Sequence, residues 1–210
     1  MPSKYVIVLE NSIAMNINNS WELLRTGLRK FINQDLLDPQ TQVGLVLFNE
    51  AASIKNTVQK VGDKHSNVRK SLDSNIPFNK RLSHKYDSCV RCGVVKAIEA
   101  LQTSGSTIGA NIILISQGHI NVLSREDDRE VLHLAERHKL RIFTLPFIEK
   151  KNNISILFES LSFKTKANSF FINPIKMSEM DVYMGIIDAL REIQARSESN
   201  IPALVSLNVR

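Results

Sequence analysis

Runs of consecutive apolar residues alternate along the chain with segments in which apolar residues recur every three or four positions. The continuous runs are residues 5–9, 43–48 and 112–115, the last directly after Asn111, and residues 140–145 form a fourth segment that is mainly apolar. Each run has the length of a strand, and its uninterrupted apolar character is typical of a strand that is buried on both faces. Strands that alternate with helices in this way predict an α/β fold.

Two further segments, residues 53–58 and 169–172, bring the number of strand candidates to six. The segment 53–58 follows residues 43–48 across a turn at Asn49-Glu50, so we expect it to be an antiparallel edge strand. We therefore predict a doubly wound, mainly parallel six-stranded sheet with helices on both faces. Residues 112–115 should lie in the centre of this sheet, because they are entirely apolar.

Helical spacing of apolar residues predicts the elements between these strands. The expected helices lie near residues 20–32, 67–72, 90–101, 124–138, 154–161 and 182–193. Ser20 is suited to cap the first of them, and Ser124 with Asp127 has the spacing of a capping box. We assign residues 1–196 to one domain and residues 197–210 to a tail or the start of a following module.

The charge of the chain is modest. Its formal net charge of +6 comes from 27 basic and 21 acidic residues, without a block of five like charges, which predicts a mildly basic, solvated surface. The loop containing Lys80, Arg81 and Lys85 has no periodicity and would suit an acidic protein partner, although an ordinary solvated loop is the simpler interpretation. We expect neither nucleic acid nor membrane insertion, since every apolar run is far shorter than the ~18 residues of a membrane-spanning helix.

Cys89 and Cys92 are spaced as C-x-x-C without a second pair, so a zinc site is not expected. Two ordinary thiols on a helix are the favoured interpretation, because a bridge between positions three apart on a helix is strained. A disulfide or a redox-active dithiol stays open as the alternative.

Motifs of catalysis and nucleotide binding are absent from the sequence. No G-x-G-x-x-G follows the first strand, and neither a phosphate-binding G-x-x-x-x-G-K-[ST] nor a Gly-x-Ser-x-Gly elbow occurs. The chain has five histidines without paired metal-ligand spacing: His65, His84, His119, His133 and His138. Of these, His119 lies on an expected site loop and is interpreted as a solvent-exposed or locally hydrogen-bonded side chain, with a general base as the alternative. We do not expect an enzyme.

Ligands of doubly wound sheets bind beyond the carboxyl ends of the strands, where three loops of this chain should meet. These loops carry Glu10-Asn11-Ser12-Ile13-Ala14, Ser88 and Ser116-Gln117-Gly118. In order and position they resemble the loops of the von Willebrand factor type A domain, and the resemblance covers about residues 4–195. The segments 43–49 and 89–97 are most similar to the A domain of the calcium-activated chloride channel regulator family.

The resemblance also implies what has happened to the family's metal site. That site uses Asp-x-Ser-x-Ser, a Thr and an Asp, which fall here on Glu10, Ser12, Ala14, Ser88 and Gln117, so that Ser12 alone is identical. Mg²⁺ requires near-octahedral oxygens at about 2.0–2.1 Å. Glu10 is one methylene longer than Asp, so its carboxylate would lie beyond the position that the ion requires. Ala14 has no side-chain oxygen, and Gln117 is neutral. We therefore expect no metal and no cofactor, with a Mg²⁺ or Ca²⁺ site of altered preference as the alternative.

The leading hypothesis is a non-enzymatic protein-interaction or adhesion domain that holds its partner without a metal. The candidate partner-binding face consists of Glu10, Asn11, Ser12, Ala14, Ser88 and Gln117. In it we expect the side chain of Gln117 to donate a hydrogen bond to Glu10 or Ser12; Asn11 and Ser12 would alternatively cap the first helix. The resemblance implies an extracellular or cell-surface parent protein. A metal-dependent adhesion module and a scaffold domain of a cytoplasmic complex are the alternatives.

Overall fold

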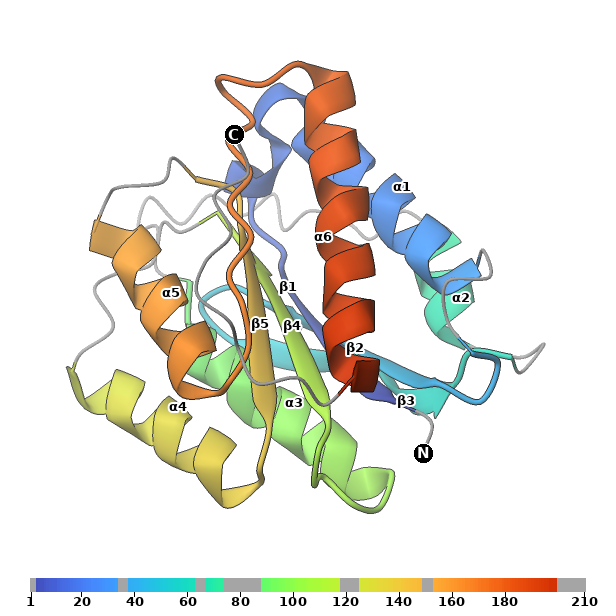
Figure 1. Ribbon diagram of the computed structural model, residues 1–210, viewed down its shortest axis with the longest axis vertical. Helices are drawn as coiled ribbons and strands as arrows, with labels where there is room; N and C mark the ends of the chain where they lie inside the picture. Colours follow the sequence, from blue (N-terminus) through green and yellow to red (C-terminus); the bar gives the residue numbers. More distant parts are fainter. Residues whose placement is uncertain are drawn as a thin grey trace.

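One mixed β-sheet organises the part of the chain that the computed structural model describes, namely residues 3–33, 38–62, 67–73, 88–117, 125–148 and 153–199. Its five strands follow the order β3-β2-β1-β4-β5 (Figure 1). They are β1 (Lys4–Glu10), β2 (Gln42–Phe48), β3 (Ala52–Lys60), β4 (Asn111–Ser116) and β5 (Arg141–Pro146). All pairs are parallel except β2 with β3. The mainly parallel α/β sheet and its antiparallel edge strand are thus confirmed.

The number of strands was predicted as six, and this is wrong by one. Residues 169–172 run beside β5, where the N–H of Phe170 donates to the carbonyl of Thr144, but the pairing amounts to one isolated bridge between Thr144 and Ser169. The segment continues beside β5 to the end of that strand, where the N–H of Ile172 donates to the carbonyl of Pro146. In the sheet order β4 is an interior strand, while β1 occupies the middle.

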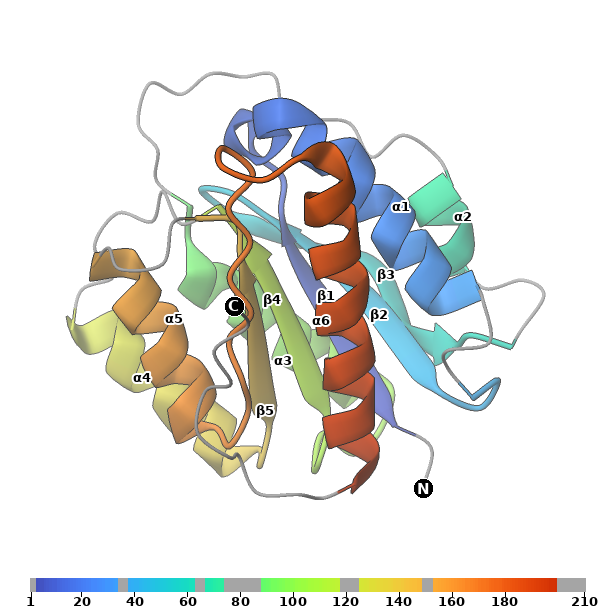
Figure 2. The ribbon, with the colours of Figure 1, turned by 45° about the horizontal axis from the view of Figure 1, so that its top comes forward.

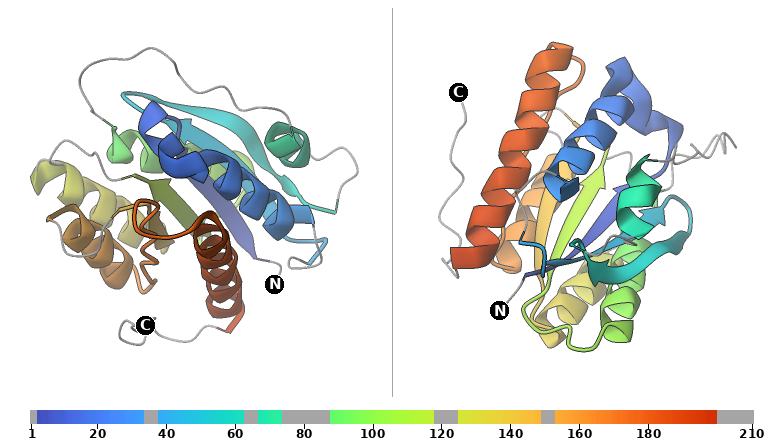
Figure 3. Two further views of the ribbon diagram at one scale, coloured as in Figure 1. Left: turned by 90° about the horizontal axis from the view of Figure 1, so that it is seen from above. Right: turned by 90° about the vertical axis from the view of Figure 1, so that its right-hand side faces the viewer.

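Helices cover both faces of the sheet (Figures 1 and 2). On one face lie α1 (Ser20–Asn33), α2 (Asn67–Asp73) and α6 (Glu179–Ser199); on the other lie α3 (Val90–Thr103), α4 (Arg125–Arg137) and α5 (Asn153–Lys164). A short 3-10 helix, η1 (Ile13–Asn19), joins β1 to α1. The two layers are separated by the sheet when the molecule is seen from above or from the side (Figure 3). None of the helices in the described ranges is long and apolar enough to cross a membrane.

The strand β1 shows why its apolar run is uninterrupted. Tyr5, Ile7 and Leu9 point into the core beneath α1 and α6, whereas Val6 and Val8 point into the core beneath α3. Successive side chains of a strand alternate between the two faces of the sheet. Because helices cover both faces, every position must be apolar, which is the signal that the sequence carries.

Some expectations about loops and ends are corrected or fall outside the described ranges. Ser20 is the first residue of α1 and not its N-cap, and its hydroxyl donates to the carbonyl of Met15 at 2.7 Å in η1. The helix α6 continues to Ser199, past the boundary assigned at residue 196, and the division into domain and tail stays a prediction. The described ranges do not include Ser124, His119, the loop with Lys80, Arg81 and Lys85, or residues 200–210.

The end of α6 is attached to the sheet by a buried polar contact. The Tyr5 hydroxyl pairs with Oγ of Ser197, which itself donates to helix carbonyls, so the tyrosine is the donor. Arg141 of β5 donates to the carbonyls of Arg196 and Ser197 at 3.0 Å each. Burial raises the pKa of the Tyr5 phenol above its usual value, and burial likewise lowers the pKa of Arg141.

We expect this contact to make the protein sensitive to alkali. A phenol whose pKa is raised by folding contributes stability that is present below its unfolded value, about 10, and is lost as the pH rises through that value toward the folded one. The melting temperature, followed by circular dichroism, should therefore fall more steeply between about pH 9.5 and 11 for the wild type than for Tyr5→Phe. Tyr183→Phe, at a partly exposed tyrosine of α6, is the control and should follow the wild type. Equal slopes for Tyr5→Phe and the wild type would contradict the assignment.

Candidate functional site

A buried carboxylate lies at the carboxyl edge of the sheet. Glu10 is the last residue of β1, and its side chain is almost completely excluded from solvent, at 1% exposure. Its Oε1 accepts hydrogen bonds from the hydroxyls of Ser12 at 2.6 Å and Ser88 at 2.7 Å. Its Oε2 accepts from the hydroxyl of Ser116 at 2.5 Å and the backbone N–H of Gln117 at 3.0 Å. We call these five residues the Glu10 cluster.

Parallel pairing places most of the cluster together. β1 and β4 are hydrogen-bonded neighbours, so Glu10 at the end of one lies beside Ser116 at the end of the other. Ser88 lies directly before α3. The next residue, Cys89, donates its N–H to the carbonyl of Asn49 at 2.6 Å and so holds the start of this helix beside the end of β2. Gly93 permits this close approach of α3 to the sheet, because a Cβ at that position would lie 2.8 Å from Cγ1 of Val8.

The cluster uses the full acceptor capacity of the Glu10 carboxylate. An ionised carboxyl group has about four lone-pair positions, and here three hydroxyls and one amide occupy them with charge-assisted hydrogen bonds. The arrangement therefore satisfies a buried charge and ties three loops to one side chain. It fits a divalent cation poorly, because the lone pairs of the single carboxylate are already occupied by four donors of the chain and Gln117 adds no second anion. Within the described ranges, no group of three or more His, Cys, Asp or Glu side chains could hold a metal ion.

Comparison with known proteins rests on structure alone, because no protein-family model and no curated protein sequence matches the chain. A solved von Willebrand factor type A protein from Catenulispora acidiphila superimposes with a TM-score of 0.65 over 93% of this chain, at 13% identity. This chain spans 42% of that protein. The conserved hypothetical protein BatB from Bacteroides thetaiotaomicron gives a TM-score of 0.61 over 89% of this chain and 98% of its own, at 14% identity.

The VWA domain of SpRpn10 also matches, with a TM-score of 0.58 over 87% of this chain and 94% of its own, at 18% identity. The chain has the von Willebrand factor type A fold. Identities this low establish the fold of the chain and leave its activity and partners to be argued from its own residues.

The sequence placed most of the cluster correctly in space and missed one member. Glu10, Ser12, Ser88 and Gln117 were expected at one edge of the A domain, and hydrogen bonds join them there. Ser116 was not singled out, although it makes the shortest bond to the carboxylate. Its signal is a small polar residue that ends the apolar run of β4, directly before the site loop.

Gln117 and Asn11 take part in a different way from the one expected. Gln117 donates to Glu10 through its main chain and not through its side chain. Asn11 donates its backbone N–H to the carbonyl of Phe48 at 2.7 Å, which joins the first loop to β2. The side-chain oxygens of both amides are buried and have no hydrogen-bond partner among the described residues. A bound water or a donor from a neighbouring loop would satisfy them.

Exposure divides the candidate face into supporting and accessible residues. Glu10, Ser88 and Gln117 are buried, whereas Asn11 and Ser12 are partly exposed. At this edge of the sheet Asn11 and Ser12 are therefore accessible, while the buried residues fix the shape of the loops. Ala14 lies in η1, and its side chain is not among those that the structure describes.

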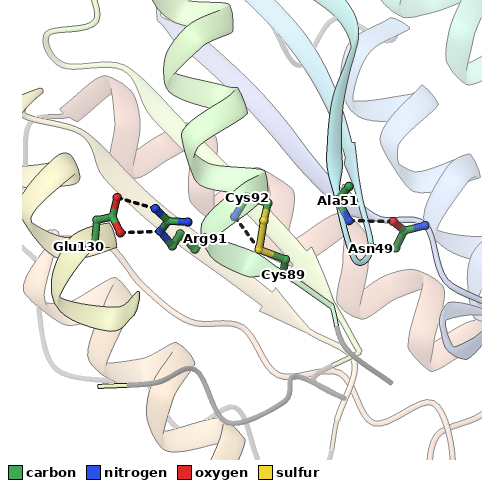
Figure 4. Close-up of a disulfide and its surroundings, with 6 residues drawn as sticks. All are labelled: Asn49, Ala51, Cys89, Arg91, Cys92 and Glu130. Carbon is green, nitrogen blue, oxygen red and sulfur yellow. Dashed lines mark hydrogen bonds and ion pairs between the residues drawn. A yellow bond between two sulfur atoms is a disulfide. The ribbon is translucent and has the colours of Figure 1, made fainter. Parts of the chain in front are cut away.

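The two cysteines form a disulfide, which corrects the favoured interpretation of two ordinary thiols (Figure 4). The expectation of strain assumed that both residues lie within the helix. Cys89 is instead the N-cap of α3, with φ −86° and ψ 87°, so its side chain turns back over the first helical turn toward Cys92. The Cα atoms are 5.2 Å apart, inside the usual range for a disulfide.

Proposed function

We propose that this A domain is a non-enzymatic protein-interaction module that binds its partner without a bridging metal. The observation that supports the proposal is the Glu10 cluster, in which a buried carboxylate accepts four hydrogen bonds from the chain itself. A carboxylate saturated in this way has no lone pair left for a cation, nor for a proton taken from a substrate. The edge then serves as a fixed surface that presents the first loop.

Titration calorimetry with Mg²⁺, Ca²⁺ and Mn²⁺ tests the metal-independent mode. We expect no saturable heat at millimolar concentrations of any of the three ions. Glu10→Gln is the control, since it would remove heat that arises at this cluster. A one-to-one binding curve that disappears in Glu10→Gln would make the domain a metal-dependent adhesion module instead.

An acidic protein is the partner that we propose. The net charge of +6 and the basic residues Lys80, Arg81 and Lys85 favour it electrostatically. Once an acidic partner is identified, reversing these three charges should weaken its binding at low salt, mainly through slower association. Added salt should reduce the difference in affinity between the variant and the wild type. Unchanged binding at low salt would remove this part of the proposal.

The parent protein that we propose is extracellular or at the cell surface and similar to the calcium-activated chloride channel regulators. The segments 43–49 and 89–97 support the likeness, and the Cys89–Cys92 disulfide supports an oxidising compartment. Blocking free thiols in intact cells before lysis, followed by reduction and mass analysis, tests the compartment. A scaffold domain of a cytoplasmic complex would carry both cysteines reduced.

A further inference from the structure

The Cys89–Cys92 disulfide has features that the interaction function does not use. It joins the N-cap of α3 to the first turn of the same helix, and both cysteines are partly exposed (Figure 4). A cross-link between residues three apart constrains the unfolded chain very little, because its stabilising effect grows with the length of the loop that it closes. Its contribution to stability is therefore small for a disulfide.

The start of α3 is also held by contacts that do not involve sulfur. The hydroxyl of Ser88 donates to Glu10, and the N–H of Cys89 donates to the carbonyl of Asn49. Between the cysteines, Arg91 makes a two-pronged ion pair with Glu130 of α4, at 2.5 and 2.9 Å (Figure 4). These contacts anchor the helix end on three sides, so opening the disulfide leaves α3 in place.

The two sulfur atoms are not equivalent. Sγ of Cys89 accepts the backbone N–H of Cys92 at 3.1 Å and lies at the N-terminus of a 14-residue helix. A negative charge on this sulfur is stabilised by that N–H and by the positive end of the helix dipole. A thiolate that is stabilised in this way leaves readily from a disulfide and attacks a new one when it is free.

We propose that Cys89 and Cys92 form a thiol–disulfide exchange site for a dithiol reductant, with Cys89 as the stabilised thiolate. The first thiolate of the reductant attacks Sγ of Cys92, the bond between the two cysteine sulfurs breaks, and Cys89 leaves as a thiolate. The second thiolate of the reductant then attacks the reductant's first sulfur, which is bonded to Sγ of Cys92 in the mixed disulfide, and Cys92 leaves as a thiolate. The protein disulfide gains two electrons and, with protons from water, becomes two thiols, while the reductant is oxidised to a disulfide.

Reduction of the folded chain is the first test. The domain is incubated with millimolar dithiothreitol without denaturant, free thiols are labelled with a polymer-linked maleimide, and the fold is followed by circular dichroism. We expect both cysteines to be labelled, an unchanged spectrum, and reoxidation when oxidised dithiothreitol is added. Labelling that requires urea would overturn the proposal, because it would show a disulfide that opens on unfolding alone.

Single-cysteine variants test the assignment of Cys89. In Cys92→Ser the remaining Cys89 should form a mixed disulfide with oxidised glutathione at pH 7 about three times faster than Cys92 does in Cys89→Ser. Mapping the first cysteine that iodoacetamide alkylates in the reduced wild type gives the same comparison if a variant does not fold. Equal rates, or a faster Cys92, would overturn the role given to Cys89.

Discussion

Glu10→Ala should lower the free energy of unfolding by about 3–5 kcal/mol, the largest effect that we expect from one polar substitution in this protein. The change removes the acceptor of four donors, and three of these, the hydroxyls of Ser88 and Ser116 and the N–H of Gln117, belong to buried residues. It also disconnects the three loops that the carboxylate joins. Urea unfolding followed by circular dichroism or tryptophan fluorescence measures the loss.

Two further variants separate the hydrogen bonds from the other consequences of this substitution. Glu10→Gln keeps the size of the side chain and about half of its acceptor capacity, so we expect a loss of about 1–3 kcal/mol. Glu22→Ala removes a glutamate of α1 that is 46% exposed and paired with Arg25, and should cost no more than about 1 kcal/mol. A loss for Glu10→Ala no larger than that for Glu22→Ala would contradict the importance of the cluster.

The combined variant Glu10→Asp, Ala14→Ser and Gln117→Asp should bind Mg²⁺ with a dissociation constant of about 0.1–1 mM, where the wild type should bind none detectably. Two anions and an added hydroxyl would then face the place that a cation occupies in the family that the loops resemble. The shorter aspartate at position 10 would set its carboxylate farther from the hydroxyls of Ser12 and Ser88, which would leave space for an ion between them.

The same variant should be less stable than the wild type without metal and should recover when metal is added. Mg²⁺ at ten times its dissociation constant contributes about 1.4 kcal/mol, which appears as a rise in melting temperature. The three single substitutions are the controls and should show no rise, while Ser88→Ala added to the combined variant should reduce it. A combined variant with no response to Mg²⁺, or a single substitution sufficient for binding, would show that the donor set has been assigned wrongly.

The fold of this protein could be predicted from its sequence because a strand that is buried on both faces has apolar residues at consecutive positions. β1 and β4 are apolar at consecutive positions since helices cover both sides of them, and the polar alternation of Ser53 to Val58 marks an edge. Parallel pairing of β1 and β4 brought the first and third loops together, whereas Ser88 is held beside them by the bond between Cys89 and Asn49. The sixth strand could not be excluded, because residues 169–172 have the composition of a strand and fail only in the extent of their pairing.

The chemistry of the edge was less accessible from sequence because it depends on dihedral angles and main-chain groups. Whether Cys89 and Cys92 can bridge depends on Cys89 being outside the helix, and its N-cap conformation is not encoded in the spacing. Gln117 donates to Glu10 through its backbone N–H. Every residue except proline has this group, so no pattern of side chains predicts the bond. Ser116 ends an apolar run and is recognised as a donor only when β1 lies beside β4.

The main-chain bond from residue 117 to Glu10 bears on how an edge of this kind can evolve. Any amino acid other than proline at position 117 supplies the same N–H, so an acid there can be exchanged for a neutral residue without breaking this tie between the third loop and β1. At position 117, a substitution can therefore abolish ion binding without removing a hydrogen bond that holds the edge. Residue 117 can therefore change its chemistry while the edge keeps its shape, whereas a change at residue 10 alters both the chemistry and the hydrogen bonds of the edge.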